Sequence, residues 1–268
     1  MKHLDRAVTA FVYIFLYAPI LVMMFFSFNA SNSTSLFAGF STKWYAELFT
    51  RRDVMNALKN TLILAVSSSL IATVLGTVAA VGVYNLRRRW TKNVLLTVNN
   101  LPMMNPDIVT GVSLMLLFVF VGRLLGAKES VGFVTLLIAH ITFNVPYVLL
   151  NVLPKLRQTD RQLVEAAMDL GCTPVRAFFK VVLPAIFPGI ASGAVMAFTL
   201  SLDDFVISNF TAGKFQTLPL FLYSMTKKRV KPDMFALSTI VFAVILVLLL
   251  TSNLLQIRAE KKQKGVRK

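Results

Sequence analysis

The stretch TDRQLVEAAMDLGCTPVRAFFKVVLP, residues 159–184, lies between long apolar segments and predicts two short helices joined by a turn. Thr159 is a candidate N-cap of the first helix, with Gln162 completing a capping box that satisfies the first free backbone amides. Gly171 is expected to end that helix. The stretch is therefore predicted to be a water-exposed segment within a membrane protein.

The second short helix is predicted from Thr173, a plausible N-cap. Pro174 fits the first helical position, because its missing N–H is not needed there. Pro184 and Pro188 are expected to end this helix before the next apolar segment begins.

The first helix has a narrow apolar face, because Leu163 and Leu170 recur at helical spacing with Ala166 and Ala167 between them. The two alanines allow another backbone to come close. Other interpretations of this stretch are an interfacial amphipathic helix, an ordinary loop and a DNA-reading helix-turn-helix. The flanking apolar segments disfavour entry into a major groove, and no nucleic-acid partner is expected.

Composition sets the class of protein. The 268 residues are 56% hydrophobic with a mean hydropathy of +0.68, whereas soluble domains are about 45–50% apolar. We predict an all-α polytopic membrane protein, with one transmembrane domain covering residues 1–268. One cysteine, Cys172, excludes an internal disulfide, and two histidines offer no metal-ligand spacing.

Six apolar segments are long enough to cross a bilayer. The predicted spans are 7–28, 59–85, 94–121, 131–151, 188–211 and 234–257, with the loop 152–187 between the fourth and the fifth. Residues 29–58 are expected to form an external loop. Residues 212–233 form another loop, whose LPLFLY centre predicts a short re-entrant or surface helix.

Two spans have special features. Gly76, Ala79, Ala80 and Gly82 in the second span are small residues that permit close helix packing in lipid. The third span is predicted to be broken, because NNLPMMNPDIVTG holds two prolines and is too polar to face lipid.

The lysines and arginines predict the orientation. The head, the loop 86–93, the loop 152–187 and the tail 258–268 hold 2, 4, 5 and 6 of them, 17 in all, and the other side holds 11. The positive-inside rule then places both termini in the cytoplasm. The external cluster KKRVK at 227–231 opposes this bias, and its role as a partner contact, a lipid contact or a solvated loop stays open.

Carboxylates inside the membrane are the chemistry to explain, because an aspartate at a helix centre costs roughly 2.5–3.5 kcal/mol on insertion scales. Ser201, Asp204, Ser208 and Thr211 would form one polar stripe on a continuous helix, so we predict that the stripe faces a transport pathway. Asp203 would point elsewhere, as a second cavity residue or a contact to a neighbouring subunit.

Asp107 has two open roles. Asn105 is expected to cap the helix that resumes at Pro106, which places Asp107 in a first turn, where the helix dipole favours a carboxylate. The alternative role is contact with a transported cation. A polyamine suits such acids, since an ammonium about 4 Å from a carboxylate gains roughly 4 kcal/mol at an effective dielectric of 20, before desolvation.

Four aromatic residues also have two open roles. Trp44, Tyr45, Tyr147 and Tyr223 are candidates either for cation–π contact with such an ammonium or for ordinary packing at the membrane interface.

EAAMDLG at 165–171, followed by Leu183 and Pro184, resembles the EAA signature of ABC importer permeases. The resemblance implies a type I, MetI-like permease fold in which this segment is the coupling helix in a groove of a cytoplasmic ATPase subunit. The implied ATPase-coupling residues are Glu165, Ala166, Ala167, Gly171, Leu183 and Pro184.

Four further stretches, YAPILVMMFFSFNAS, FSTKWYAELF, PMMNPDIVTGVSLMLLF and FTLSLDDFVISNF, make nearly the whole chain similar to C-type permeases of the spermidine/putrescine importer family. This resemblance implies a bacterial inner-membrane subunit for polyamines. Its implied partners are a homologous second permease, two copies of an ATPase, an extracytoplasmic polyamine-binding protein and membrane lipid.

No GxxxxGK[ST] loop is present, so ATP and Mg²⁺ are expected on the partner ATPase and no cofactor or enzymatic activity is expected in this chain. Two alternatives stay open. One keeps the ABC importer and changes the cargo, to another amine or to ferric iron. The other is a self-sufficient secondary transporter or channel that uses Asp203 or Asp204 as a proton carrier.

Overall fold

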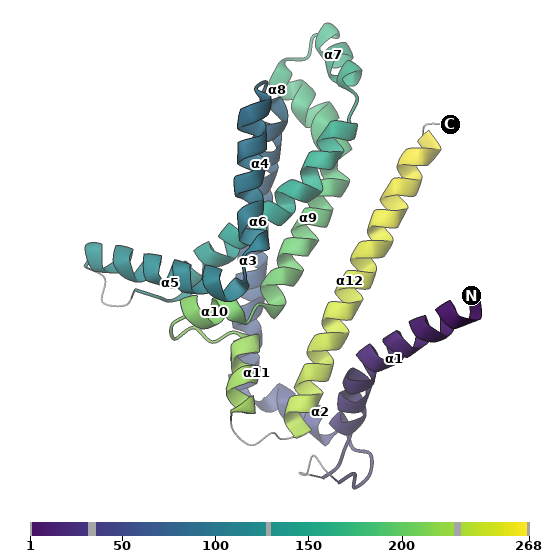
Figure 1. Ribbon diagram of the computed structural model, residues 1–268, viewed down its shortest axis with the longest axis vertical. Coiled ribbons are helices and arrows are strands. Elements are labelled where there is room, and N and C mark those ends of the chain that lie inside the picture. Colours follow the sequence, from purple (N-terminus) through teal and green to yellow (C-terminus); the bar gives the residue numbers. More distant parts are fainter. Residues whose placement is uncertain (1, 32–35, 127–129, 228–231, 267–268) are drawn as a thin grey trace. The chain divides into compact units, whose positions relative to one another are not determined.

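The computed structural model describes residues 2–31, 36–126, 130–227 and 232–266, and these are almost wholly helical (Figure 1). The α-helices are α1 (Lys2–Ser27), α2 (Lys43–Thr50), α3 (Arg52–Asn85), α4 (Arg89–Met104), α5 (Asp107–Leu124), α6 (Phe133–Gln158), α7 (Arg161–Asp169), α8 (Pro174–Ala177), α9 (Leu183–Asp203), α10 (Val206–Thr211), α11 (Leu218–Thr226) and α12 (Pro232–Val266). One π-helical turn, η1 (Phe178–Val182), joins α8 to α9. Within the described ranges the only β-type pairing is a bridge between Asn29 and Phe40, so the all-α prediction is confirmed.

Among the described residues, six helical segments are long and apolar enough to cross a membrane, which confirms the predicted number of spans. They are Val8–Ser27, Arg52–Asn85, Asp107–Leu124, Phe133–Gln158, Pro174–Asp203 and Pro232–Thr251. The second begins earlier than the predicted 59, inside the expected loop 29–58. Asp53 lies in the first turn of α3, where a carboxylate favours the helix, and Val54 and Ala57 are buried. The loop also contains α2.

The third span is broken as predicted, but at one proline only. Pro102 lies inside α4, whereas α4 ends at Met104 and α5 begins at Asp107. Asn105 is extended, as expected for a residue that precedes a proline. The prediction that Asn105 caps the next helix is wrong, because Pro106 occupies the N-cap position and no side chain caps α5.

The prediction that Pro184 and Pro188 end a helix is also wrong. Helix continues from Pro174 through both prolines to Asp203, with η1 as a wider turn just before Pro184. A proline removes one backbone donor, and a local π-turn is one of the ways in which membrane helices accommodate that loss. The second loop helix and the fifth span are therefore one continuous element.

The chain divides into two compact units. The second unit, residues 60–219 and 248–268, has a core in which α3, α6 and α9 meet at the buried side chain of Val148. A Cβ on Gly76 would lie 2.6 Å from the Val148 Cβ, and one on Gly193 would lie 3.1 Å from its Cα. Gly76 therefore has the close-packing role predicted for it, whereas a Cβ on Gly82 would meet nothing within 4 Å.

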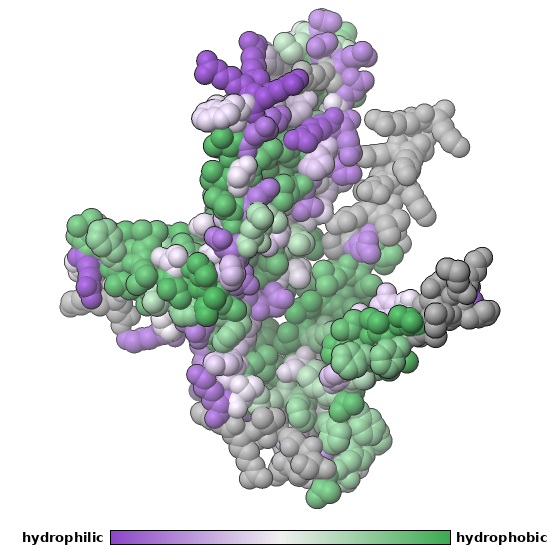
Figure 2. All heavy atoms as spheres, in the orientation of Figure 1, coloured by the Kyte–Doolittle hydropathy of each residue, from purple (hydrophilic) through white to green (hydrophobic). Residues whose placement is uncertain are grey.

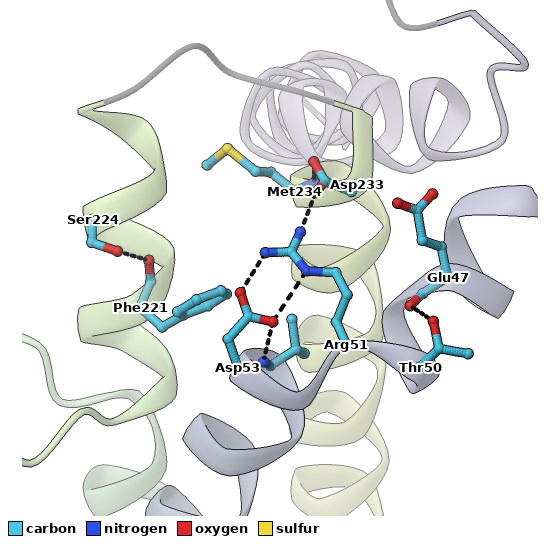
Figure 3. A network of polar contacts seen from close by, with 9 residues as sticks. Glu47, Thr50, Arg51, Asp53, Phe221, Ser224, Asp233 and Met234 are labelled. Atoms are coloured by element: carbon cyan, nitrogen blue, oxygen red, sulfur yellow. Dashed lines mark hydrogen bonds and ion pairs between the residues drawn. The ribbon is translucent and has the colours of Figure 1, made fainter.

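The first unit, residues 1–59 and 220–247, is joined by Arg51 (Figure 3). Its guanidinium donates to Asp53 and Asp233 at 2.6 Å each, and lies 5.9 Å from the ring of Phe221. The hydrogen bond with Asp53 raises the pKa of Arg51 above its ordinary value. The network fixes the corner between α2 and α3 against the start of α12.

Trp44, also in the first unit, is packed, and the ammonium of the neighbouring Lys43 lies 4.7 Å from the centre of its ring. Trp44 is 5% exposed and its indole N–H donates to the carbonyl of Asn29 at 2.7 Å. The predicted short helix in LPLFLY is confirmed as part of α11. Residues 228–231, which are most of the basic cluster, and the side chains of the basic tail lie outside what the structure describes.

Candidate functional site

The first candidate site is a break between α9 and α10, within the second unit. α9 ends at Asp203, Asp204 is extended, and α10 resumes at Val206. The prediction that Ser201, Asp204 and Ser208 share one continuous helix is therefore wrong. The break explains how Asp204 is tolerated in an apolar segment, because its carboxylate meets the free amides of a helix start.

The Asp204 carboxylate accepts three hydrogen bonds from α10. The backbone N–H of Ile207 lies 3.2 Å from Oδ1, and the N–H and hydroxyl of Ser208 lie 2.8 and 2.7 Å from Oδ2. His140 on α6 adds a fourth contact, with Nε2 3.4 Å from Oδ2. Asp204 therefore stabilises the break between α9 and α10.

A second set of polar contacts lies beside this one and involves Ser201. Its hydroxyl accepts from the amide of Asn144 at 2.7 Å and lies 2.9 Å from the hydroxyl of Ser68. Asn144 and His140 are one turn apart on α6, and both are fully buried. Polar side chains from α3, α6, α9 and α10 therefore form one buried cluster.

Two atoms of this cluster have no hydrogen-bond partner in the described part of the chain, His140 Nδ1 and Asn144 Oδ1. Buried polar atoms are usually paired, so an unpaired donor or acceptor costs about 1–3 kcal/mol. The two unpaired atoms therefore reduce the net free energy by which the cluster stabilises the fold. Neither residue was predicted as a site residue, although their spacing of four in an apolar segment indicates one polar helix face.

Asp203 differs from its neighbour, because its side chain is exposed and makes no ion pair with any described residue. It is the acid of the pair that is available to a cation. Asp107 is also exposed, in the first turn of α5. Its predicted first-turn position is confirmed, and its contact with a cation stays a prediction.

The second candidate site is the loop helix α7 with the turn that follows it. The N-cap is Asp160, whose carboxylate accepts from the Gln162 N–H at 2.9 Å. The prediction of Thr159 as the cap is wrong, because its hydroxyl instead donates to the carbonyl of Lys155 in the last turn of α6. The acceptor that caps α7 instead is the carboxylate of Asp160, one residue later in the chain.

The turn after α7 agrees with the prediction. Gly171 has φ +85°, its N–H donates to Met168, and the N–H of Cys172 donates to Ala167, which together form a Schellman motif. Thr173 then caps α8, accepting from the Arg176 N–H at 3.4 Å.

α7 presents apolar side chains to solvent. Leu163 is 57% and Leu170 is 87% exposed, and Ala166 beside them is exposed while Ala167 is half-buried. Figure 2 shows hydrophilic side chains gathered at the end of the second unit that carries α7, while hydrophobic ones cover most of α5. The two exposed leucines are candidates for a contact with a partner.

The other predicted coupling residues lie in different places. Glu165 is exposed and projects from the opposite side of α7 from Leu163. Leu183 and Pro184 are outside the loop, at the start of α9, where Leu183 packs against the core. In the described ranges no group of three or more His, Cys, Asp or Glu residues is placed to hold a metal ion.

Comparison with known proteins places these features in a family. A family model described as "binding-protein-dependent transport system inner membrane component" matches residues 72–264. The chain is 40% identical over 250 residues to the putrescine transport system permease protein PotI of Escherichia coli K12, covering 93% of this chain and 89% of that protein. It is 39% identical over 258 residues to the spermidine/putrescine transport system permease protein PotC of the same strain, covering 95% and 93%.

Solved structures agree in fold. A chain of a bacterial ABC transporter that imports the acidic polysaccharide alginate superposes with a TM-score of 0.72 at 15% identity, covering 96% of this chain and 95% of that one. A chain of the MetNI methionine ABC transporter superposes with a TM-score of 0.60 at 17% identity, covering 79% and 98%. The predicted type I, MetI-like architecture is confirmed.

Proposed function

We propose, since this chain belongs to the family of binding-protein-dependent transport system inner membrane components, that it is one permease subunit of an ATP-driven importer of spermidine and putrescine. The observation that supports polyamines as the cargo is the similarity to two polyamine permeases along almost their whole length. The family is one of transport components rather than enzymes. A self-sufficient secondary transporter is not compatible with a component that depends on a binding protein.

The break after α9 supports a cationic cargo. Asp203 is an exposed carboxylate at the end of an apolar helix, where an acid is costly unless a cation or water meets it. Asp204 supports the pathway indirectly. Its hydrogen bonds to α10 fix the backbone at the break and therefore the position of the neighbouring Asp203. Ser201 and Ser208 stabilise the same break from within the buried cluster.

α7 suits the proposed role of a coupling helix. Leu163 and Leu170 offer an apolar contact to a groove in an ATPase subunit, and the Schellman turn at Gly171 fixes the direction in which the chain leaves α7. Closure of the ATPase would then move α7 and, through α8, the membrane helix α9. In this proposal Glu165, Ala166 and Ala167 set the fit of α7, while Leu183 and Pro184 transmit its position.

The remaining partners follow from this scheme. A homologous permease completes the pathway, a pair of ATPase subunits binds ATP and Mg²⁺, and an extracytoplasmic binding protein delivers the polyamine. Both termini and α7 lie on the cytoplasmic side of the inner membrane, in agreement with the excess of basic residues predicted there.

The test is uptake of radiolabelled putrescine and spermidine by cells that lack other polyamine importers and express the whole transport system. Asp203→Asn is expected to lower uptake about tenfold with the complex still assembled, as for a loss of about 1.4 kcal/mol of attraction. Asp204→Asn is expected to lower the amount of assembled complex as well, because an amide cannot accept all of the hydrogen bonds that the carboxylate receives from α10.

Glu47→Gln is the control for a change of charge at an exposed carboxylate that the proposed pathway does not include, and it should leave uptake unchanged. An assembled wild-type complex that takes up neither polyamine would overturn the proposed cargo. Full uptake by Asp203→Asn would contradict a pathway role for that carboxylate. It would not contradict polyamines as the cargo.

A further inference from the structure

The segment that joins α3 to α4, residues 86–92 and here called the α3–α4 junction, is strongly basic. It contains Arg88, Arg89 and Lys92, and no acidic residue occurs in the sequence between Asp53 and Asp107. The two arginines are exposed and the lysine is half-buried. None of the three cations forms an ion pair with any residue that the structure describes. The junction therefore carries positive charge that the described part of the chain does not neutralise.

Arg87, the fourth cation of the junction, differs from the other three. It lines a cavity behind α7 together with Asp160 and Glu165. Acids of the same chain therefore share its surroundings, and we assign the excess charge to the other three cations alone.

An apolar stripe runs along α4 from the same end. Trp90, Val94, Val98 and Leu101 recur at helical spacing, which places them on one face of the helix. Trp90 is 75% exposed, and the other three are between 40% and 55% exposed. Leu96 lies on the opposite face and packs against the core. α4 therefore packs through one face and leaves an apolar face uncovered by the described part of the chain.

Two aromatic residues lie at the junction itself. Trp90 belongs to a residue type that is enriched where a membrane meets water. The ammonium of Lys92 lies 5.9 Å from the ring of Tyr84 on α3, so this cation is held between the two helices. Figure 2 shows hydrophilic side chains at the end of the second unit where α4 begins, with hydrophobic ones following along the helix.

An anionic phospholipid matches both the charge and the stripe. Its phosphate would meet the cations at the start of α4, and an acyl chain would lie along the apolar face. A soluble protein with an acidic surface could reach the cations. It could not cover the stripe, which extends about 16 Å along the helix at about 1.5 Å per residue.

We propose that the α3–α4 junction is a binding site for an anionic phospholipid such as phosphatidylglycerol. The phosphate binds Arg88, Arg89 and Lys92, and one acyl chain lies along Trp90 and Val94. The inference goes beyond the proposed function, because it does not depend on the cargo. The proposed orientation enters only in assigning the lipid to the cytoplasmic leaflet.

The test uses Trp90 as the probe, one of two tryptophans in the chain. The assembled transporter is placed in nanodiscs of equal parts phosphatidylcholine and phosphatidylglycerol, with one of the two lipids brominated on its acyl chains. The emission of Trp90 is the difference between the wild-type complex and the Trp90→Phe complex. Quenching requires a bromine beside the ring, so it reports an acyl chain on the stripe and not a free phosphate ion.

Brominated phosphatidylglycerol is expected to quench Trp90 with an apparent affinity at least about fivefold that of brominated phosphatidylcholine, as for the attraction of one basic residue to an anionic surface. The double variant Arg88→Gln with Arg89→Gln should bring this ratio close to one. The matched control is Arg52→Gln with Lys59→Gln, which removes two exposed cations near the start of α3. It should keep the wild-type ratio.

A second measurement needs no variant of the basic residues. About 1 M salt shortens the Debye length to about 3 Å, so the wild-type ratio should fall towards one. Equal quenching by the two lipids in the wild type at low salt would overturn the site. So would an equal loss of the ratio in the control variant. Absence of quenching of Trp90 by either lipid would also overturn it, because a protein partner would then cover the stripe.

Discussion

At the scale of single residues, Asp203 and Asp204 show how adjacent identical side chains acquire different roles. Asp204 receives hydrogen bonds from the first turn of α10 and contacts His140, while Asp203 is exposed. The difference comes from the break in the helix between them and Val206. On a continuous helix Asp204 would have no free amides of a helix start to meet.

His140 is predicted to be a positioning residue for Asp204. His140→Leu removes one of its buried contacts and should lower the free energy of unfolding by about 1–3 kcal/mol. His140→Gln keeps a side-chain donor and should recover part of the loss. Thermal unfolding of the purified complex measures both.

The control for this prediction is Thr142→Leu, an exposed position on the same helix. If His140→Leu and Thr142→Leu unfold at the same temperature as the wild type, the buried cluster does not stabilise the break.

At the scale of elements, Gly171 is predicted to decide where α7 ends. Its φ of +85° disfavours any residue with a Cβ by about 1–2 kcal/mol, although a Cβ there would meet nothing within 4 Å. Gly171→Ala should therefore reduce polyamine uptake while the complex still assembles. Uptake per assembled complex is the measurement.

Gly82→Ala is the matched control, because that glycine is also open to an added Cβ but lies inside α3 with an ordinary helical φ. Loss of uptake in Gly82→Ala, or normal uptake in Gly171→Ala, would contradict a backbone role for Gly171.

The elements also show which parts of the fold were predictable. Gly171, Thr173 and Pro174 act on backbone groups within a few residues, so their roles were correctly predicted from local sequence. Pro184 and Asp204 were misjudged because their effects depend on a π-turn and on contacts from other helices. Neither the π-turn nor the contacts from other helices can be predicted from the local sequence.

At the scale of the whole molecule, the sole cysteine offers a test of orientation. Cys172 lies in the turn after α7, on the side proposed to be cytoplasmic. A membrane-impermeant maleimide should label it only after the inner membrane is opened. In a Cys172→Ser background, Lys214→Cys in the loop after α10 should be labelled in intact spheroplasts.

Labelling of Cys172 in intact spheroplasts would reverse the proposed topology. Labelling of both positions only in opened membranes would place the loop after α10 on the inner side and contradict the six-span path.

Hydropathy predicted the number of spans correctly, because a bilayer imposes a similar apolar length on each of them. The predicted starts of the second, third and fifth spans, at 59, 94 and 188, differ from the observed Arg52, Asp107 and Pro174. The buried cluster was only partly predictable, because Ser68, His140 and Ser201 come from three helices that are distant in the chain. Ser201 and Ser208 were recognised as polar residues in an apolar segment, but their partners depend on helix packing.

In the proposed coupling scheme, the continuous helix from Pro174 to Asp203 would act as a lever. Its 30 residues span about 45 Å at about 1.5 Å per residue, so a tilt of about 5° at the loop end displaces the far end by about 4 Å. That displacement is as long as the distance over which an ammonium and a carboxylate attract each other strongly. A few degrees of rotation at the ATPase would therefore be enough to bring Asp203 into contact with the cargo or to withdraw it.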